Sequence, residues 1–341
     1  MKGQGKLIDT RKLAERLRGR SVDVINRRVL ISHLSGSEQE VDFSKPANCG
    51  GFGRVRNFHL CTPSGWPSNP LPIAPACKAI GIQPIPDTIP AQVFQNAACA
   101  WRCWYCFVPY NLLAANPKHS KWFTSKELVT LYAQEQNRPL IIDLSGGSPD
   151  LVPEWVLWMM DALTDASLHK STFLWSDDNL STTCLFDHLN SRDLNRLVQY
   201  QNYARVCCFK GYDARSFTFN TRAMPKDYDC QFQIMSKLLN LGLDIYGYVT
   251  LTSPYTDRVK EGVCDFIDRL QALDSNLPLR VIPLQIRIFT PVKERLCPER
   301  KRSLDVQEEA ISVWNSEIAS RFDIALRSAN ITDVPLNAGK K

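Results

Sequence analysis

Cys99-Ala-Trp-Arg-Cys103-Trp-Tyr-Cys106 is the stretch around which the rest of the chain can be organised. Its spacing, C-x3-C-x2-C, brings three thiols together in a short loop without a fourth. A structural zinc site takes four protein ligands, whereas a [4Fe–4S] cluster held by three cysteines keeps one iron open to another ligand. We therefore expect Cys99, Cys103 and Cys106 to hold a [4Fe–4S] cluster. Two alternatives stay open at this point: zinc bound by two of the thiols with a distant partner, and simple packing.

The sequence changes character near residue 90, where an alternation of strands and helices begins. Six strands each followed by a helix predict a parallel sheet with right-handed crossovers, as an open doubly wound sheet or a partial (β/α)6 TIM-type barrel. The expected strands are Gln92–Ala97, Leu140–Leu144, Thr172–Trp175, Ala204–Phe209, Asp244–Leu251 and Leu279–Phe289. The expected helices are Ser125–Gln136, Pro153–Ala166, Leu185–Tyr200, Tyr228–Leu241, Arg258–Asp274 and about Leu304 to Arg321.

The residues before this alternation form a different kind of segment. A basic helical stretch, Thr10 to Arg20, and a strand-like run, Val22 to Ile31, come first. Prolines and glycines then crowd the interval from Pro46 to Pro90, where we expect little regular structure. The predicted organisation is an irregular, loop-rich extension over 1–90, a core domain over 91–302, and a helix with a tail over 303–341.

The cysteine motif directly follows the first expected strand. In α/β folds, ligand sites gather at the carboxyl ends of the strands. Position and chemistry therefore agree, which favours the cluster over zinc or packing.

On these features the chain resembles the radical SAM (S-adenosylmethionine) superfamily over about residues 90–300. In that superfamily the open iron binds the amino and carboxylate groups of SAM. An aromatic residue just before the third cysteine lies against the adenine, and Tyr105 has that place here. Ala100 stands where an asparagine is common, at a position that supplies no metal ligand. The resemblance implies an α/β fold with a partial (β/α)6 TIM-type barrel.

Further matches come at the ends of the later strands. Gly146-Gly147-Ser148-Pro149 resembles the superfamily's G-G-E-P motif, which contacts the amino group of SAM, with Ser148 in place of the glutamate. After the third strand, the resemblance makes Ser176, Asp177 and Asn179 candidates for binding the ribose or carboxylate of SAM. The alternative for these three residues is capping or turn formation.

The fourth strand ends in Lys210-Gly211-Tyr212-Asp213, similar to the Lys-Gly-x-Asp element of glycyl-radical activating enzymes. By this resemblance Lys210 pairs with the SAM carboxylate or with substrate; the alternative is a solvated lysine in a turn.

The chemistry implied by the resemblance is reductive cleavage of SAM to methionine and a 5′-deoxyadenosyl radical that abstracts hydrogen from a substrate. An electron donor similar to flavodoxin or ferredoxin is then expected. The substrate stays open between protein or peptide, RNA and a small molecule, and no catalytic side chain is assigned. One version of this enzyme would be an activase that installs a radical on a glycyl-radical enzyme. The alternative from another class is a non-catalytic zinc-binding interaction module.

Composition bounds the setting of this chemistry. Hydrophobic residues make up 44% and charged residues 22% of 341 residues, which is ordinary for a globular protein. The net charge of +6 supports an anionic partner only weakly. Without a signal peptide or an apolar run long enough for a membrane helix, we expect a cytoplasmic protein with no membrane partner. In a reducing cytoplasm, clustered cysteines indicate metal or catalysis rather than disulfides.

Two other groups of residues stay open. Cys49, Cys61 and Cys77 could ligate an auxiliary cluster or simply pack, while Cys207 and Cys208 point to opposite faces of a strand. The mostly basic run from Lys293 to Arg302 could touch a nucleic acid, or be a solvated loop.

Overall fold

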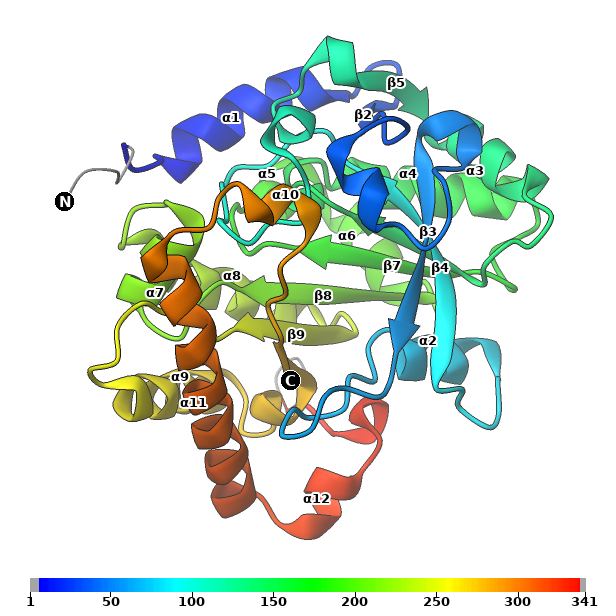
Figure 1. Ribbon diagram of the computed structural model, residues 1–341. Helices are drawn as coiled ribbons and strands as arrows, with labels where there is room; N and C mark the ends of the chain where they lie inside the picture. Colours follow the sequence, from blue (N-terminus) through cyan, green and yellow to red (C-terminus); the bar gives the residue numbers. More distant parts are fainter. Residues whose placement is uncertain (1–5, 338–341) are drawn as a thin grey trace.

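A seven-stranded sheet with the order β10-β9-β8-β7-β6-β4-β3 lies at the centre of the fold. The computed structural model describes residues 6–337. Strands β4 and β6 to β10 pair in parallel, and β3 pairs antiparallel with β4. The sheet curls into a half-barrel (Figure 1), in agreement with the expected partial TIM-type barrel. The strands are β3 (Gly53–His59), β4 (Thr88–Gln95), β6 (Ile141–Ser145), β7 (Phe173–Asp178), β8 (Tyr203–Phe209), β9 (Ile245–Thr250) and β10 (Val281–Leu284).

Helices follow the parallel strands in the order that the sequence predicts. The predicted helix from Leu185 to Tyr200 is two helices, because Asn190 caps a new one by accepting from the amide of Asp193. The last long helix begins at Pro298, earlier than expected, with its proline in the first turn. The helices are α3 (Ser125–Gln134), α4 (Glu154–Asp165), α5 (Cys184–His188), α6 (Ser191–Gln199), α7 (Ala214–Thr221), α8 (Asp227–Leu241), α9 (Val259–Leu273), α10 (Thr290–Lys293), α11 (Pro298–Arg321) and α12 (Ile324–Ser328). Within residues 6–337, no helix has both the length and the apolar character needed to cross a membrane.

The N-terminal extension is more regular than the sequence predicts. After α1 (Thr10–Ser21), the strand-like run is split into β1 (Val22–Asp23) and β2 (Arg28–Ser32), which form a second sheet with β5 (Ser120–Thr124). The expectation of little regular structure from Pro46 to Pro90 is wrong, because this interval contains β3 and α2 (Ile73–Ile80). β3 gains its hydrogen bonds from β4, a partner that local sequence does not reveal.

The final expected strand is shorter than predicted. β10 ends at Leu284, and the chain then leaves the sheet as a crossing segment, defined here as residues 285–297, that runs over the face of the sheet (Figure 1). Pro283 lies within β10, and the strand pairs only with β9, so the proline occupies an edge of the sheet, where a missing donor is tolerated.

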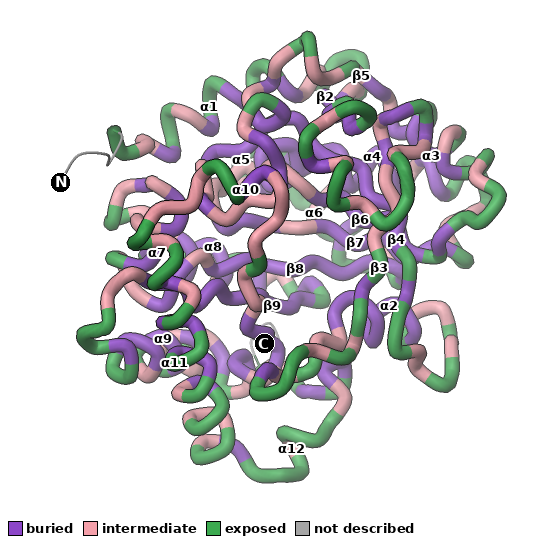
Figure 2. Tube along the Cα trace, viewed as in Figure 1, coloured by how far each residue is buried: buried purple, intermediate pink, exposed green. Residues whose placement is uncertain are grey.

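The two faces of the sheet bury different side chains, since successive residues of a strand point to opposite sides. The strands are buried along most of their length (Figure 2). Residues such as Ile142, Leu144 and Leu174 belong to the core beneath the helices. Ile141 and Phe173 belong to a second core on the inner, concave face, which includes buried residues of α2.

The inner face has an apolar layer toward the amino ends of the strands and a polar layer toward their carboxyl ends. The apolar layer consists of Ala91, Ile141, Phe173, Ala204 and Tyr246. The polar layer consists of Arg54, Gln95, Asp143, Asp177, Lys210 and Thr250, and the side chain of Arg56, which pairs with Ala91, approaches it through Asp143 at 3.9 Å.

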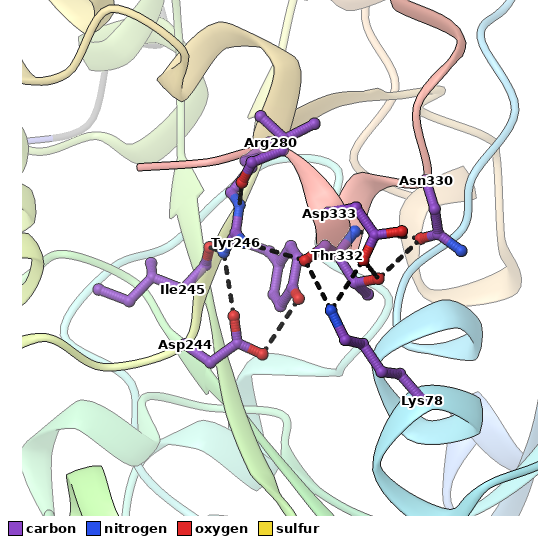
Figure 3. A network of polar contacts seen from close by, with 9 residues as sticks. Lys78, Asp244, Ile245, Tyr246, Arg280, Asn330, Thr332 and Asp333 are labelled. Atoms are coloured by element: carbon purple, nitrogen blue, oxygen red, sulfur yellow. Dashed lines mark hydrogen bonds and ion pairs between the residues drawn. The ribbon is translucent and has the colours of Figure 1, made fainter. Parts of the chain in front are cut away.

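The C-terminal segment closes the fold beside the amino-end side of β9 (Figure 3). Arg280 donates to Asp244 Oδ1 at 3.0 Å and to the Val334 carbonyl at 3.1 Å. Lys78 of α2 donates to the Thr332 carbonyl at 3.1 Å. These bonds fix residues 332–334 to the same end of the molecule as the apolar layer.

Candidate functional site

The cysteine loop, residues 96–107, begins directly after β4, at the carboxyl end of the strand as predicted. Its backbone is held by distant parts of the chain. The amide of Cys99 donates to the Leu113 carbonyl at 3.1 Å, and the amides of Arg102 and Trp104 donate to the last residues of α7, the carbonyls of Thr221 and Asn220, also at 3.1 Å. The loop is therefore a fixed element rather than a free turn.

Two buried tryptophans anchor this loop through their indole nitrogens. Trp101 Nε1 donates to Thr10 Oγ1 at 3.1 Å, and Trp104 Nε1 donates to Asn220 Oδ1 at 3.0 Å. Both rings are almost fully buried. These two side chains thus turn away from solvent and attach the loop to α1 and α7.

The three thiols share one environment. Cys99 is buried, and Cys103 and Cys106 are partly buried. Burial raises the pKa of Cys103 to about 12, with a lowering contribution from Lys210 and raising ones from Cys106 and Cys99. Burial, followed by the neighbouring Cys99, also raises the pKa of Cys106. The thiols are therefore close enough to influence one another's ionisation, and the protonated form is favoured in the metal-free protein.

This donor set fits an iron–sulfur cluster in kind. Iron–sulfur clusters are held by deprotonated cysteines, and a cationic metal would offset the burial that opposes the thiolates. Among the described residues, no group of three or more His, Cys, Asp or Glu side chains is placed to hold a metal ion. The thiols therefore do not converge on one point, and in a cluster each cysteine binds its own iron, which does not require such convergence.

The glycine turn after β6 packs directly against the cysteine loop. Gly146 and Gly147 both have positive φ, 66° and 62°. A Cβ on Gly147 would stand 2.4 Å from the carbonyl oxygen of Ala98, so only glycine allows this approach. The amide of Ser148 donates to that same carbonyl at 2.6 Å. The turn is therefore part of the support of the loop.

Ser148, predicted to contact SAM, is fully buried and bonded to protein groups. Its hydroxyl donates to Cys99 Sγ at 3.3 Å and accepts from the Ala100 amide at 3.3 Å. Asn179 Nδ2 donates to it at 3.0 Å and to the Gly147 carbonyl at 2.8 Å. Ser148 and Asn179 thus connect the end of β7, the glycine turn and the first cysteine.

The two other residues predicted after the third strand lie on opposite faces. Ser176 is fully buried on the outer face, where its hydroxyl shares a hydrogen bond of 2.9 Å with Tyr203. Asp177 lies on the inner face and accepts from Ser145 Oγ. Burial raises the pKa of Asp177, while Ser145, Arg56 and Lys210 lower it. The structure brings only Asp177 of this pair into the polar layer.

Lys210 and Tyr105 lie close to the thiols. Burial lowers the pKa of Lys210, but Cys208, Cys103 and Asp177 outweigh it, so the net shift is upward and the side chain stays charged. Tyr105 shares a hydrogen bond of 3.0 Å with Thr250 Oγ1 at the end of β9, and burial, then Cys103, raises its pKa. Lys210 is thus a partly buried cation beside the cysteine loop, rather than a solvated lysine.

The sequence reading missed Arg295, which holds the far end of the loop. Its guanidinium donates to the carbonyls of Cys106 at 2.6 Å and Val108 at 3.2 Å and lies 4.0 Å from the ring centre of Tyr110. Arg300 in turn donates to the Arg295 carbonyl. Part of the basic run from Lys293 to Arg302 is therefore structural, with its two best-held arginines turned toward the protein.

The sequence reading also missed the charged residues of β3. Arg54 and Arg56 alternate along this strand and face the same side as Asp143 of β6. The Arg-x-Arg pattern next to the first barrel strand was the available signal, and treating the interval as irregular hid it.

The cysteines of the extension do not come together in one place. Cys49 is buried next to Glu135, Cys61 is exposed, and Cys77 is buried in α2. Cys207 and Cys208 belong to the cores on opposite faces of the sheet, as predicted.

Comparison with known proteins gives little support of its own. No family model and no curated protein matches the sequence. Among solved structures, SuiB from Streptococcus suis matches in a crystal structure of SuiB, in one bound to S-adenosylmethionine and in one bound to the precursor peptide SuiA. Sequence identity is 14%, the TM-scores are 0.36 to 0.37, and the match covers 53% of this chain and 36 to 37% of SuiB.

Proposed function

We propose that this chain is a radical SAM enzyme that holds a [4Fe–4S] cluster on Cys99, Cys103 and Cys106. The observation that carries the proposal is the place of the C-x3-C-x2-C loop: it follows the first of six parallel strands, at the carboxyl edge of a half-barrel. Ligand sites of parallel α/β folds occupy that edge. The three thiols share one environment there, which is the second line of support.

When bound, the cluster and SAM would supply a 5′-deoxyadenosyl radical by one-electron reduction and cleavage of the sulfonium, with methionine as the other product. The chain's own residues bind and orient. Lys210 offers a partly buried positive charge to a carboxylate, and Tyr105 offers an aromatic face next to the third cysteine. Gly147 permits close backbone contact between the turn and the loop.

The polar residues after the third strand divide their work. Asp177, on the inner face, is available to a bound molecule, whereas Ser148 and Asn179 position the glycine turn beside Cys99. Ser176 supports β8 from the outer face. We therefore assign cofactor contact to Tyr105, the Gly146–Gly147 backbone, Asp177 and Lys210.

The partners follow from the chemistry. A one-electron donor of low potential, similar to flavodoxin or ferredoxin, would reduce the cluster. The substrate is a molecule with an abstractable hydrogen atom that reaches the inner face of the half-barrel. A peptide or protein substrate, including a glycyl-radical enzyme, and a small molecule are both compatible with this function.

The test is anaerobic reconstitution of the full-length protein. Iron and sulfide are assayed, dithionite and SAM are added, and 5′-deoxyadenosine is measured. We expect about four irons per chain, as a single [4Fe–4S] cluster requires, and SAM cleavage that depends on the reductant. Stoichiometric zinc in place of iron, or a fully reconstituted protein that leaves SAM intact, would instead favour the zinc-binding interaction module.

A further inference from the structure

The guanidinium of Arg54 is a partly buried cation that forms no ion pair with any described carboxylate. Within residues 6–337 it makes no hydrogen bond and no ion pair, and its Nε atom is fully shielded from solvent. Its nearest aromatic neighbours are Phe43 and Phe107, with ring centres 5.3 and 5.1 Å away. Burial, then the neighbouring Arg56, lowers the pKa of Arg54 to about 10. Shielding one nitrogen of a charged group without a hydrogen-bond acceptor has a cost, so this arginine can take a polar partner that the chain itself does not supply.

Two neighbours of Arg54 on the inner face also have unused hydrogen-bonding groups. Neither oxygen of Asp143 accepts a hydrogen bond, and its ion pair with Arg56 is long, at 3.9 Å. The amide nitrogen of Gln95 is buried and donates to no described group. Buried polar groups are almost always satisfied, so a set of orphans on one face indicates a missing polar ligand.

The strand register places these groups around one spot. Arg54 pairs with Val93, and Val93 pairs with Asp143, so the arginine and the carboxyl flank Val93 from either side. Their Cα atoms lie about 10 Å apart, two strand spacings. Gln95 follows Val93 by one pleat repeat on the same strand and the same face. A small polar group above Val93 would therefore meet all three side chains.

The charge of the polar layer favours an anion at this spot. Arg54, Arg56 and Lys210 face only Asp143 and Asp177. Burial, then Asp177, raises the pKa of Asp143 to about 8, so near neutral pH this group is mostly protonated. The layer then carries an excess of positive charge, and its protonated carboxyl becomes a hydrogen-bond donor.

We propose that Arg54, Gln95 and Asp143 bind an oxyanion group of the substrate, a carboxylate or a phosphate, on the inner face of the half-barrel. This inference rests on the proposed function, because it assigns the bound group to the substrate of that site. A guanidinium fork matches an oxyanion with two parallel hydrogen bonds. Phe107 directly follows Cys106, so a substrate anchored at Arg54 lies beside the cysteine loop.

The test measures anion binding rather than turnover. The reconstituted full-length protein is titrated with sodium acetate and, separately, sodium phosphate at ionic strength held constant with sodium chloride, and the shift in Tm is recorded. We expect a saturable rise for the wild type, and the anion that saturates at lower concentration identifies the group. Arg54→Gln should weaken that binding by about tenfold or more, since it removes a charge-assisted pair.

Two variants make the test specific. Arg215→Gln is the matched control, since Arg215 is exposed and paired with Asp257 elsewhere, and it should titrate like the wild type. Asp143→Asn keeps a hydrogen-bond donor and removes the carboxylate, so it should bind the anion as tightly as the wild type or severalfold more tightly. If Arg54→Gln does not fold, Arg54→Lys, which keeps the charge but loses the fork, should show the weakened binding.

Several results would overturn the site. These are a wild-type response no different from chloride, an Arg54→Gln protein that titrates like the wild type, or tenfold weaker binding in Asp143→Asn. A loss of SAM affinity in Arg54→Gln with unchanged anion binding would assign Arg54 to the cofactor instead. Saturable, Arg54-dependent binding in a protein that never cleaves SAM would leave the oxyanion site standing and overturn the proposed function, so the two failures are distinguishable.

Discussion

The two layers of the inner face show how one sheet separates stability from chemistry. Toward the amino ends of the strands, Ile141 and Phe173 are fully buried and pack in the same core as α2. One pleat repeat further along the same strands come Asp143 and Trp175, and then Ser145 and Asp177. The backbone is the same in both layers, so side-chain identity alone turns a core into a site. The polar layer can therefore hold charged side chains that cost stability, because the buried apolar layer stabilises the fold.

The largest expected effect belongs to the cysteine loop above the polar layer. Cys103→Ala should lose bound iron and all SAM cleavage, because two thiolates cannot hold a cluster that needs three. The control is Cys61→Ala, since Cys61 is exposed and far from the loop in sequence, and it should keep both. Iron and sulfide assays with detection of 5′-deoxyadenosine measure the outcome. Retained cleavage in Cys103→Ala would show that the ligands are misassigned.

The apolar layer should respond in stability instead. Phe173→Ala removes a fully buried ring, and such changes lower the free energy of unfolding by about 3–5 kcal/mol. Urea unfolding checks this value. The fraction of Phe173→Ala that remains folded should still bind iron. A fully folded variant that does not bind iron would show that the two layers are not independent.

The contact between the glycine turn and the cysteine loop comes next in size. Gly147→Ala places a methyl group 2.4 Å from the Ala98 carbonyl oxygen, so the loop has to move. We expect the free energy of unfolding to fall by about 2 kcal/mol or more, in addition to the ~1 kcal/mol that an alanine in the left-handed conformation costs. Gly242→Ala is the matched control, with a positive φ of 80° and no atom within 4 Å of the added carbon. Equal losses in the two variants would exclude the steric explanation.

A further effect depends on pH and isolates the polar layer. Burial raises the pKa of Asp143 to about 8 from its ordinary value of 3.8, so the native state binds more protons than the unfolded chain between these values. Stability from this group is full below about pH 4 and falls as the pH rises toward 8, by at most ~1.4 kcal/mol per pH unit. Asp143→Asn should flatten this slope in unfolding measurements at several pH values. An unchanged slope would mean that Asp143 is ionised in the native state.

The smallest effect is expected at the surface of the basic run. Lys301 and Arg302 are exposed on α11, unlike Arg295 and Arg300. Changing both to glutamine should leave the urea midpoint within experimental error, because isolated surface charges contribute little. If RNA is a partner, the same change should reduce the salt slope of its binding by about 2. An unchanged salt slope would exclude RNA contact by these two residues.

The sequence predicts the parallel part of this fold well, because most of its strands are buried runs rich in apolar residues that alternate with helices. Thr124 and Glu127 form the expected capping box, and the cysteine loop lies where it was predicted. β3 could not be found in the same way. Its burial is incomplete, with arginines at positions 54 and 56, and it becomes a strand only by pairing with β4.

The candidate site divides along similar lines. Asp177 and Lys210 lie in the polar layer because strand-end polar residues near a ligand motif often do. The outer-face position of Ser176 depends on pleat phase, and a one-residue shift in the expected strand boundary reverses it. The roles of Ser148 and Arg295 depend on contacts with residues 49 and 189 positions away, which no local pattern encodes.

The bond from Arg295 to the Cys106 carbonyl has a consequence for biosynthesis. The two residues are 189 positions apart, and the cysteine loop leaves the ribosome first. Since chains are made from the N-terminus at about 5–20 residues per second, the loop waits on the order of ten seconds or more for its last backbone partner. If the proposed cluster forms, iron delivered before residue 295 is made would meet thiols on an unfinished support, and insertion into the final geometry would follow the synthesis of Arg295.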